Sequence, residues 1–284
     1  MHALLNAFKA PRPALGVWLT TPGFFHARAL ALAHPSIDWI CLDGEHGMVP
    51  GPGGGGSGLA ECIAAIHTAR AGAGDKSANP PSTLVRIPAT GSTGLGSTGW
   101  QIKLALDAGA RGVVVPMVSN AQQAKEVVAD SRFPPVGRRG FGSPYTQMNW
   151  GMGLSAAEYL DKANDEVVVV VQIETPEGLE NVKEIAEVDG MFSSSGRTTS
   201  RGRWGFPAPS PDPVPEIEAH LQHVREKAQA AGKKCGIYCT SGAQAARRVE
   251  EGFDMINVIS DVGAMTGAVA EHVSAALGSS RSAS

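Results

Sequence analysis

Two short polar motifs follow apolar runs, and their side chains are of kinds that do chemistry. Asp43-Gly44-Glu45-His46 follows Trp39–Leu42, and Gln172-Ile173-Glu174 closes the run that begins at Val167. Arg86 stands between two apolar residues in a third run. A charge at the edge of a buried segment is costly unless it is paired or binds a metal. We therefore expect these residues to belong to a functional site.

Gln172 and Glu174 are two positions apart in an extended segment, so their side chains point to the same face. A carboxylate and an amide oxygen that converge suit an oxygen-preferring cation such as Mg2+ or Mn2+. The alternative is that Glu174 forms a structural ion pair with Arg86. Spacing alone leaves both interpretations open.

His46 follows two acidic residues, and a histidine near carboxylates is a candidate general base. The alternative is a loop histidine with no role in chemistry. Asp107 lies late in a predicted helix, where its carboxylate opposes the helix dipole. That placement indicates a specific partner for Asp107, and a solvated acid explains it equally well.

The elements that must position these residues are predicted from eight apolar runs, most of them continuous, as in strands buried on both faces. They are Leu15–Thr20, Trp39–Leu42, Thr83–Ile87, Gly112–Pro116, Val167–Gln172, Gly190–Phe192, Cys235–Cys239 and Met255–Ile259. Helical patterns separate them, with N-caps expected at Thr175 (before Pro176), Asn120 and Ser241, and a C-terminal glycine at Gly252. Eight strand–helix repeats predict a parallel (β/α)8 TIM barrel, with a doubly wound open sheet as the alternative.

The 284 residues suit a single barrel domain over 1–284. Three stretches rich in Gly, Pro or Ser are predicted to be irregular loops, at 50–58, 71–82 and 193–213. The glycine run within the first is not a phosphate loop, because no Lys-Ser/Thr pair follows it.

Composition argues against several classes of function. A formal net charge of −3 disfavours a nucleic-acid binder. No apolar run approaches the roughly 20 residues that cross a bilayer, and the first residues lack the pattern of a secretory signal. The four cysteines are predicted to be free buried thiols, which favours a reducing, cytoplasmic location.

A series of motifs in order along the chain resembles the HpcH/HpaI aldolase family of class II 2-oxo-acid aldolases. The resemblance covers about Leu15 to Ala276. Its motifs are Leu15-Gly16-Val17-Trp18-Leu19, Asp43-Gly44-Glu45-His46-Gly47, Val85-Arg86-Ile87-Pro88, Leu106-Asp107-Ala108-Gly109-Ala110, Val115-Pro116-Met117-Val118, Phe133-Pro134-Pro135 with Gly137-Arg138-Arg139-Gly140, and Gln172-Ile173-Glu174-Thr175.

This resemblance implies a metal-dependent aldolase that cleaves or forms 4-hydroxy-2-oxo acids through a pyruvate enolate. The implied cofactor is a divalent metal (Mg2+, Mn2+ or Co2+), and the implied partners are a small 2-oxo acid and an aldehyde. Neither a nucleic acid nor a membrane is expected as a partner. The family also implies a (β/α)8 barrel and a homo-oligomer, a hexamer or a trimer, with a swapped terminal helix.

The resemblance assigns a role to each matching residue. Glu174 matches a metal-binding carboxylate, and Gln172 matches a pocket residue beside the metal. Arg86 matches the arginine that binds the ketone or enolate oxygen of the substrate. His46 matches the general base, with Asp43 and Asp107 as its orienting partners. Two further residues, Ser194 and Ser195, fall in the loop that offers backbone N–H groups to the substrate carboxylate.

The sequence departs from the family pattern at Arg197, which falls where the family has a second metal-binding Asp. No acidic residue lies between Asp189 and Asp212, so the site would keep one metal carboxylate. One hypothesis is a sequence error in the Ser193–Trp204 stretch of an ordinary aldolase. The other is a true variant whose metal affinity and activity are reduced.

Three readings of function follow. The first is the aldolase just described. The second lies within the family and is an oxaloacetate decarboxylase or a synthase of the macrophomate type. The third is a catalytically inactive barrel with a binding or assembly role, for which the Arg197 loop is the main support.

Overall fold

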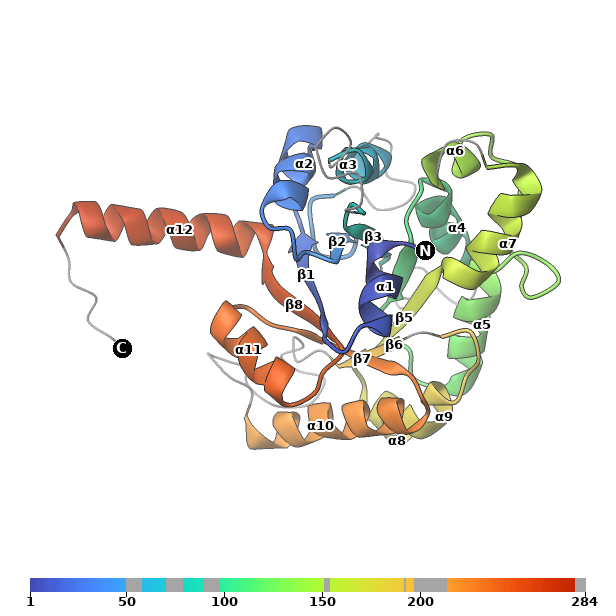
Figure 1. Cartoon of the computed structure of the whole chain (residues 1–284). Coiled ribbons are helices and arrows are strands. Elements are labelled where there is room, and N and C mark those ends of the chain that lie inside the picture. Colours follow the sequence, from blue (N-terminus) through green and yellow to red (C-terminus); the bar gives the residue numbers. More distant parts are fainter. Residues whose placement is uncertain are drawn as a thin grey trace.

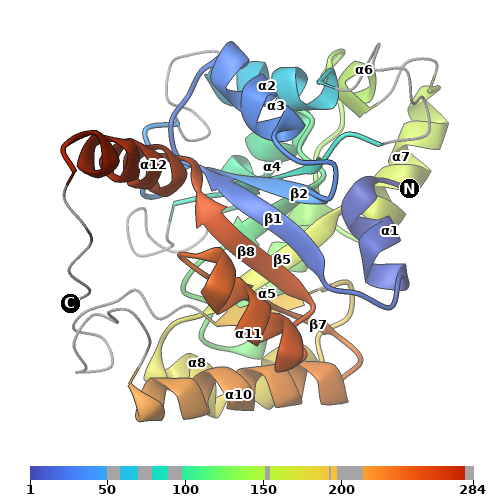
Figure 2. The same ribbon diagram turned by 60° about the vertical axis from the view of Figure 1, so that its left-hand side comes forward.

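The computed structural model describes residues 1–49, 58–69, 79–88, 98–150, 154–191, 193–196 (by its backbone) and 214–278. The strands found there all pair in parallel and in sequence order, and β8 pairs with β1, so the sheet closes into a barrel (Figures 1 and 2). The strands are β1 (Ala14–Leu19), β2 (Trp39–Asp43), β3 (Ser82–Arg86), β4 (Gly112–Val115), β5 (Val168–Ile173), β6 (Ser193–Gly196), β7 (Lys234–Tyr238) and β8 (Met255–Ser260). The predicted parallel α/β architecture is confirmed.

Helices follow the strands and surround the sheet (Figure 1). They are α1 (Ala3–Lys9), α2 (Phe24–Leu32), α3 (Gly58–His67), α4 (Thr98–Asp107), α5 (Ala121–Ser131), α6 (Thr146–Trp150), α7 (Ala156–Glu166), α8 (Pro176–Glu180), α9 (Val182–Ala186), α10 (Pro215–Ala230), α11 (Gly242–Glu250) and α12 (Asp261–Ala276). The last of these, α12, leaves the carboxyl end of β8 and projects away from the barrel (Figure 2). Among the described residues, no helix combines the length and the apolar composition that a membrane crossing requires.

The helix caps predicted from sequence are confirmed. The side chain of Thr175 accepts a hydrogen bond from the N–H of Gly178, with Pro176 opening α8. Asn120 and Ser241 cap α5 and α11 in the same way. The backbone of Gly252 has φ +86°, the left-handed conformation that favours glycine after a helix.

Side chains of the strands alternate between two cores, because successive residues of a strand face opposite sides of the sheet. One core lies between the sheet and the helices, and includes Val85, Val169 and Val171. The other fills the barrel interior, and includes Trp18, Trp39, Cys41, Leu84, Val114, Val170 and Met255. Leu4 and Leu5 of α1 belong to this inner core, so α1 closes the amino end of the barrel. All four cysteines are buried free thiols, as predicted.

The sixth strand differs from the prediction. It was expected at Gly190–Phe192, but β6 spans Ser193–Gly196 and pairs with Val170–Ile173 on one side and Lys234–Ile237 on the other. The predicted loop at 193–213 is therefore wrong for its first four residues, and 197–213 lies outside the described residues. A strand of three serines and a glycine has no apolar pattern, so its position is set by pairing with its neighbours.

The other two predicted loops lie mostly outside the described residues. Within 50–58, only Gly58 is described, and it opens α3. Within 71–82, residues 79–82 are described, and Ser82 already belongs to β3.

Candidate active site

The polar residues of the candidate site occupy the last inward-facing positions of their strands. The inward series are Trp39, Cys41 and Asp43 in β2, Ser82, Leu84 and Arg86 in β3, and Val168, Val170 and Gln172 in β5. Each series is apolar in the barrel centre and polar at the carboxyl end of the strand. Parallel barrels place their active sites at this end. The sequence thus brings Asp43, Arg86 and Gln172 to the same end of the barrel interior.

Arg86 is the most tightly held of these residues. It is 0% exposed, and Asp43 is its register partner on the neighbouring strand. The Nε and Nη2 groups of Arg86 donate to the two carboxylate oxygens of Asp43, at 2.9 and 2.7 Å. The Nη1 atom lies 2.8 Å from Oε2 of Glu45, and the guanidinium carbon lies 4.4 Å from the ring centre of Trp18. Arg86 therefore pairs with Asp43 and Glu45, the two acidic residues of the Asp43–His46 motif.

These contacts leave part of the guanidinium available. An arginine side chain carries five N–H donors, and the contacts with described residues use three of them. One N–H on Nη1 and one on Nη2 remain. Two parallel N–H groups on a fixed, planar cation suit an oxygen that gains negative charge during a reaction.

Asp43 holds the start of the following loop as well as Arg86. Its Oδ1 accepts hydrogen bonds from the backbone N–H groups of Glu45 (3.1 Å) and His46 (3.2 Å). Burial alone would raise the pKa of Asp43, but the hydrogen bonds and charge of Arg86, aided by these two N–H groups, lower it below its ordinary value. Asp43 is thus a carboxylate at neutral pH, and in this structure it contacts the backbone of His46 and not its ring.

Glu45 joins the two residues predicted to do chemistry. Its Oε2 lies 2.8 Å from Nη1 of Arg86 and 3.4 Å from Nε2 of His46. The Glu45 side chain is 10% exposed, whereas that of His46 is 64% exposed. The imidazole is therefore open to a substrate while one of its nitrogens lies beside a carboxylate. Sequence reasoning placed Glu45 in the motif but gave it no role.

Gln172 has an amide oxygen without a partner. The residue is 2% exposed, and its Oε1 atom receives no hydrogen bond from the described residues. A buried polar atom without a partner is costly, and a ligand or ion that supplies one removes that cost. Glu174 follows one residue after β5, and it is half-buried.

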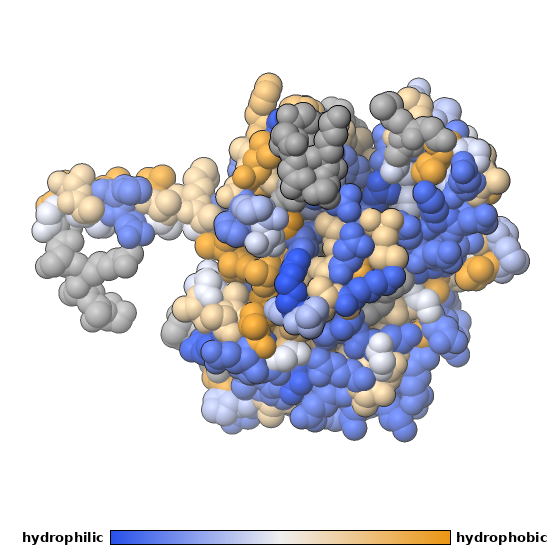
Figure 3. Space-filling model, viewed as in Figure 1, coloured by the Kyte–Doolittle hydropathy of each residue, from blue (hydrophilic) through white to orange (hydrophobic). Residues whose placement is uncertain are grey.

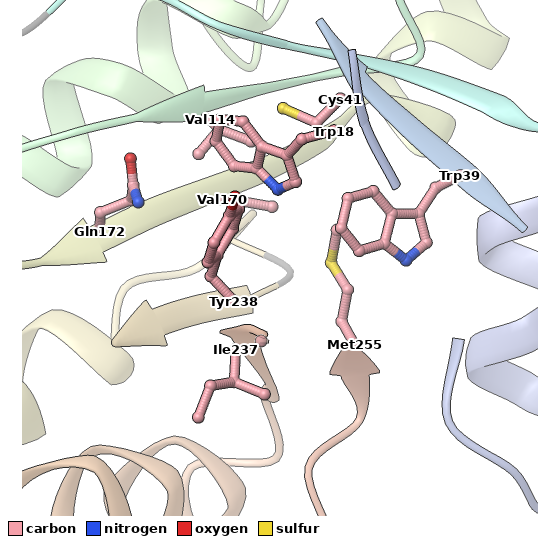
Figure 4. Close-up of a pocket in the computed structure, with 10 residues that line it drawn as sticks. Trp18, Trp39, Cys41, Val114, Val170, Gln172, Ile237, Tyr238 and Met255 are labelled. Atoms are coloured by element: carbon pink, nitrogen blue, oxygen red, sulfur yellow. The ribbon is translucent and has the colours of Figure 1, made fainter. Parts of the chain in front are cut away.

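An aromatic layer lies beneath this end of the barrel. Gln172, Trp18 and Tyr238 line a small cavity of about 30 Å3. Figure 4 shows these side chains, with Trp39 and Met255 farther from Gln172. The rings of Trp18 and Tyr238 meet edge to face, with centroids 5.7 Å apart. Trp18 also supports the face of Arg86, a role that the sequence analysis missed. Trp18 faces the barrel interior near the carboxyl end of β1, and this position in the strand is the signal that could have revealed its role.

Asp107 is not brought to this end of the barrel in one chain. A helix that leads into a strand ends at that strand's amino end, and Asp107 is the last residue of α4, which precedes β4. Its carboxylate accepts from Lys103 (2.5 Å) and from Arg139 (2.8 Å). The predicted contact between Asp107 and His46 is therefore absent within one chain.

The predicted substrate-binding serines lie in β6, beside the end of β5. Ser194 pairs with Val171 and Ser195 with Gln172, which places their backbone next to the inward-facing glutamine. Arg197, the residue that departs from the family pattern, lies outside the described residues.

The donors available to a divalent cation are few. Among the described residues, no three His, Cys, Asp or Glu side chains converge as a metal cluster. The oxygens that fit are the unpaired amide oxygen of Gln172 and the carboxylate of Glu174, both hard donors of the kind that Mg2+ and Mn2+ prefer. Asp43 and Glu45 are already engaged by Arg86. The residues therefore fit an open cation site that leaves positions for water or substrate.

Comparison with known proteins finds relatives in both sequence and structure. Residues 15–193 match the HpcH/HpaI aldolase/citrate lyase family model. The chain is 32% identical over 275 residues to a hydroxypyruvate/pyruvate aldolase of Rhizorhabdus wittichii, covering 96% of this chain and 97% of the relative. It is 33% identical over 253 residues to a 4-hydroxy-2-oxo-heptane-1,7-dioate aldolase of Salmonella dublin, covering 88% and 85%. The crystal structure of macrophomate synthase superimposes with a TM-score of 0.77 at 26% identity, covering 98% of this chain and 88% of that one.

The chain belongs to the HpcH/HpaI aldolase/citrate lyase family. The family resemblance predicted from the motifs is confirmed, and both named relatives are aldolases.

Proposed function

We propose that this protein is a (β/α)8-barrel aldolase that forms or cleaves a 4-hydroxy-2-oxo acid through a pyruvate enolate. The observation that carries the proposal is the arrangement of Arg86. A buried guanidinium is held by two carboxylates and keeps two N–H groups available at the end of the barrel where active sites lie. Such a group stabilises the negative charge that develops on a ketone oxygen as it becomes an enolate.

The proposed cleavage divides the work between Arg86 and His46. Arg86 donates to the C2 oxygen of the substrate and stabilises it as electrons arrive. His46 removes the proton of the 4-hydroxyl group, directly or through a water. The C3–C4 bond then breaks, the hydroxyl carbon leaves as an aldehyde, and the electron pair of the broken bond forms the enolate. Protonation of that enolate at C3 gives pyruvate, and the reverse sequence is an aldol addition.

Glu45 and Asp43 position these two groups. Asp43 fixes the plane of the guanidinium by a two-point contact, which is more restrictive than a single hydrogen bond. Glu45 lies beside both Arg86 and His46, so its negative charge stabilises the positive charge that His46 acquires with the proton. The proposal thus gives Glu45 a part in the chemistry without contact to the substrate.

Glu174 and the amide oxygen of Gln172 would hold a divalent cation, in keeping with the family. When bound, such an ion draws electron density from the carboxylate and ketone oxygens of a 2-oxo acid. Ser194 and Ser195 are proposed to lie beside the substrate carboxylate, since their backbone lies next to Gln172.

A second candidate reaction is the decarboxylation of oxaloacetate, alone or as the first step of a macrophomate-type synthesis. It uses the same enolate but needs no base, because carbon dioxide leaves without a proton transfer. The likeness to macrophomate synthase over nearly the whole chain favours testing it. Arg86 would serve both reactions, whereas His46 would serve only the aldol reaction.

One experiment separates these possibilities. The protein is incubated with Mg2+ or Mn2+ and either oxaloacetate or a 4-hydroxy-2-oxo acid, and pyruvate is followed by lactate dehydrogenase. We expect both substrates to yield pyruvate, Arg86→Lys to lose about 100-fold on both, and His46→Asn to lose mainly the aldol cleavage. Absence of turnover with every metal would refute the proposal and favour a barrel kept for binding or assembly.

We also propose that the chain assembles with copies of itself through α12. Every residue from 262 to 278 is exposed, although the helix carries an apolar stripe of Val262, Met265, Val269, Val273 and Leu277 (Figure 3). The root of the helix is fixed, since Asp261 accepts hydrogen bonds from Thr20, Thr21 and His26. A rigidly anchored helix with an exposed apolar stripe is typical of a contact between subunits.

A further inference from the structure

A second pocket lies at the amino end of the barrel, away from the candidate active site. It has a volume of about 430 Å3, within the range of small-ligand sites. Its walls come from the start of the chain, the end of α3, the starts of β3 and β4, α6 and α7, and they include His2, His67, Arg111, Trp150 and Lys162. In Figures 1 and 2, α1 and α7 lie side by side at this end.

The pocket is separate from the active site. Asp43 and Arg86 end their strands, whereas Ser82 and Arg111 lie where β3 and β4 begin. Between the two ends, the inner core of the barrel is filled by aromatic and aliphatic side chains, with Leu4 of α1 at its amino end. A molecule in this pocket would therefore not reach the residues proposed for catalysis.

Arg111 forms no salt bridge with a carboxylate in the described part of the chain, and the charge of Glu166 acts on it only from a greater distance. Its Nη2 donates to the backbone carbonyl of Trp150 at 2.5 Å, and its guanidinium carbon lies 4.2 Å from the centre of the Trp150 ring. These contacts use one of five N–H donors. Burial lowers the pKa of Arg111 to about 10, so it remains charged at neutral pH. A sheltered charge of this kind calls for an anionic partner.

Trp150 forms part of the pocket wall beside Arg111. The residue is 6% exposed, and its indole Nε1–H has no hydrogen-bond partner among the described residues. This atom is buried inside the protein, and other atoms of Trp150 line the pocket. Trp150 therefore serves as a reporter beside Arg111 and not as a donor to a ligand.

The remaining polar groups leave the pocket positive. His2 is bonded to the Ser82 hydroxyl and the Glu166 carbonyl, and His67 to the Thr83 hydroxyl. Burial lowers the pKa of His2 to about 4 and that of His67 to about 3, so both are neutral at physiological pH. Among the charged side chains that line the pocket, Arg111 and Lys162 are opposed by Glu166 alone.

We propose that this pocket binds a small molecule through an oxyanion, a carboxylate or phosphate group that accepts hydrogen bonds from Arg111 and from Lys162 at the rim. Both donors suit the several lone pairs of an oxyanion, and the planar guanidinium matches its geometry in two-point contact. Carboxylate and phosphate share this chemistry. The pocket volume admits a group of metabolite size beyond the anion itself.

The test uses the full-length protein labelled with 5-fluorotryptophan and followed by 19F NMR. The five tryptophans give separate probes, and Trp150→Phe assigns the signal of interest. Inorganic phosphate and malonate are titrated against sodium chloride at matched ionic strength. We expect a saturable shift of the Trp150 signal with at least one of the two oxyanions and none with chloride. The oxyanion that binds more tightly identifies the natural group.

Variants of the charged residues test whether the oxyanion binds in this pocket. Arg111→Gln is expected to weaken it about tenfold or more, as the loss of a charge-assisted hydrogen bond predicts. Lys162→Gln, at the exposed rim, is expected to weaken it about two- to fourfold and keeps the test valid if Arg111→Gln fails to fold. Arg138→Gln, a surface arginine outside the pocket, and Glu174→Gln, at the other end of the barrel, should leave the affinity unchanged.

Three results would overturn the proposal. The first is no saturable shift of the Trp150 signal with either oxyanion. The second is a shift that chloride reproduces, which would show a general salt effect. The third is an affinity that Arg111→Gln and Lys162→Gln both leave intact.

Discussion

Asp43→Ala removes the carboxylate that holds the buried Arg86 guanidinium by hydrogen bonds of 2.9 and 2.7 Å. Arg86 is 0% exposed, so water cannot replace the lost acceptors. Breaking a buried ion pair by removing one partner costs about 3–5 kcal/mol. The remaining contact with Glu45 places the expected loss near the lower end, at about 3 kcal/mol of the free energy of unfolding. The guanidinium also loses its fixed plane, so the aldol rate should fall about 100-fold.

Urea denaturation and the pyruvate assay measure these two losses. Asp130→Ala is the matched control, because it breaks an Asp–Arg pair whose arginine is 60% exposed and should cost under about 1 kcal/mol. The triple variant Asp43→Leu, Glu45→Gln, Arg86→Met replaces both carboxylates and the guanidinium by uncharged side chains. It should recover stability over Asp43→Ala while remaining inactive.

The Asp43–Arg86 pair makes the free energy of unfolding depend on pH. The pKa of Asp43 is lowered in the folded protein, so its stabilisation is present above its unfolded pKa of about 4 and is lost as the pH falls through the folded value. The stabilities of wild type and Asp43→Ala should therefore converge in acid. A loss of stability below about 1 kcal/mol in Asp43→Ala at neutral pH, or a triple variant less stable than Asp43→Ala, would refute the reasoning.

Three further predictions follow from the site and the assembly. Glu45→Gln should slow aldol cleavage about tenfold more than oxaloacetate decarboxylation in the coupled assay, because only cleavage needs a positive charge on His46. An equal loss of rate on both substrates would contradict this role of Glu45. Met265→Asp in the exposed stripe of α12 should reduce the mass measured by light scattering, whereas an unchanged mass would exclude α12 from the interface. Arg197→Asp should raise the affinity for Mg2+ measured by calorimetry at least tenfold, since it replaces a positive charge by a carboxylate. Equal Mg2+ affinities of the variant and the wild type would show that residue 197 does not face the ion.

The strands and helix ends could be predicted because their signals are local. Continuous apolar runs mark strands that are buried on both faces, and the caps at Thr175 and Ser241 are single residues whose side chains bond to nearby backbone. β6 could not be predicted in this way. Its Ser-Ser-Ser-Gly sequence has no apolar pattern, and only pairing with β5 and β7 defines it.

The candidate site was predictable in its residues but less so in their contacts. The motifs identified Asp43 and Arg86, yet only the register of β2 against β3 shows that they face each other. The bridging position of Glu45 depends on side-chain geometry, which spacing does not reveal. The topology alone could have shown that Asp107 lies at the opposite end of the barrel from His46 in one chain, because α4 precedes β4.

Exchange of the methyl protons of pyruvate for deuterium tests the central proposal most directly, because it reports the enolate without need of the correct aldehyde. The protein is incubated with pyruvate and Mg2+ or Mn2+ in deuterium oxide, and the methyl signal is followed by proton NMR. The proposal predicts exchange well above the rate with metal alone, and about 100-fold less with Arg86→Lys. Exchange no faster than the metal control, or equal in wild type and Arg86→Lys, would contradict it.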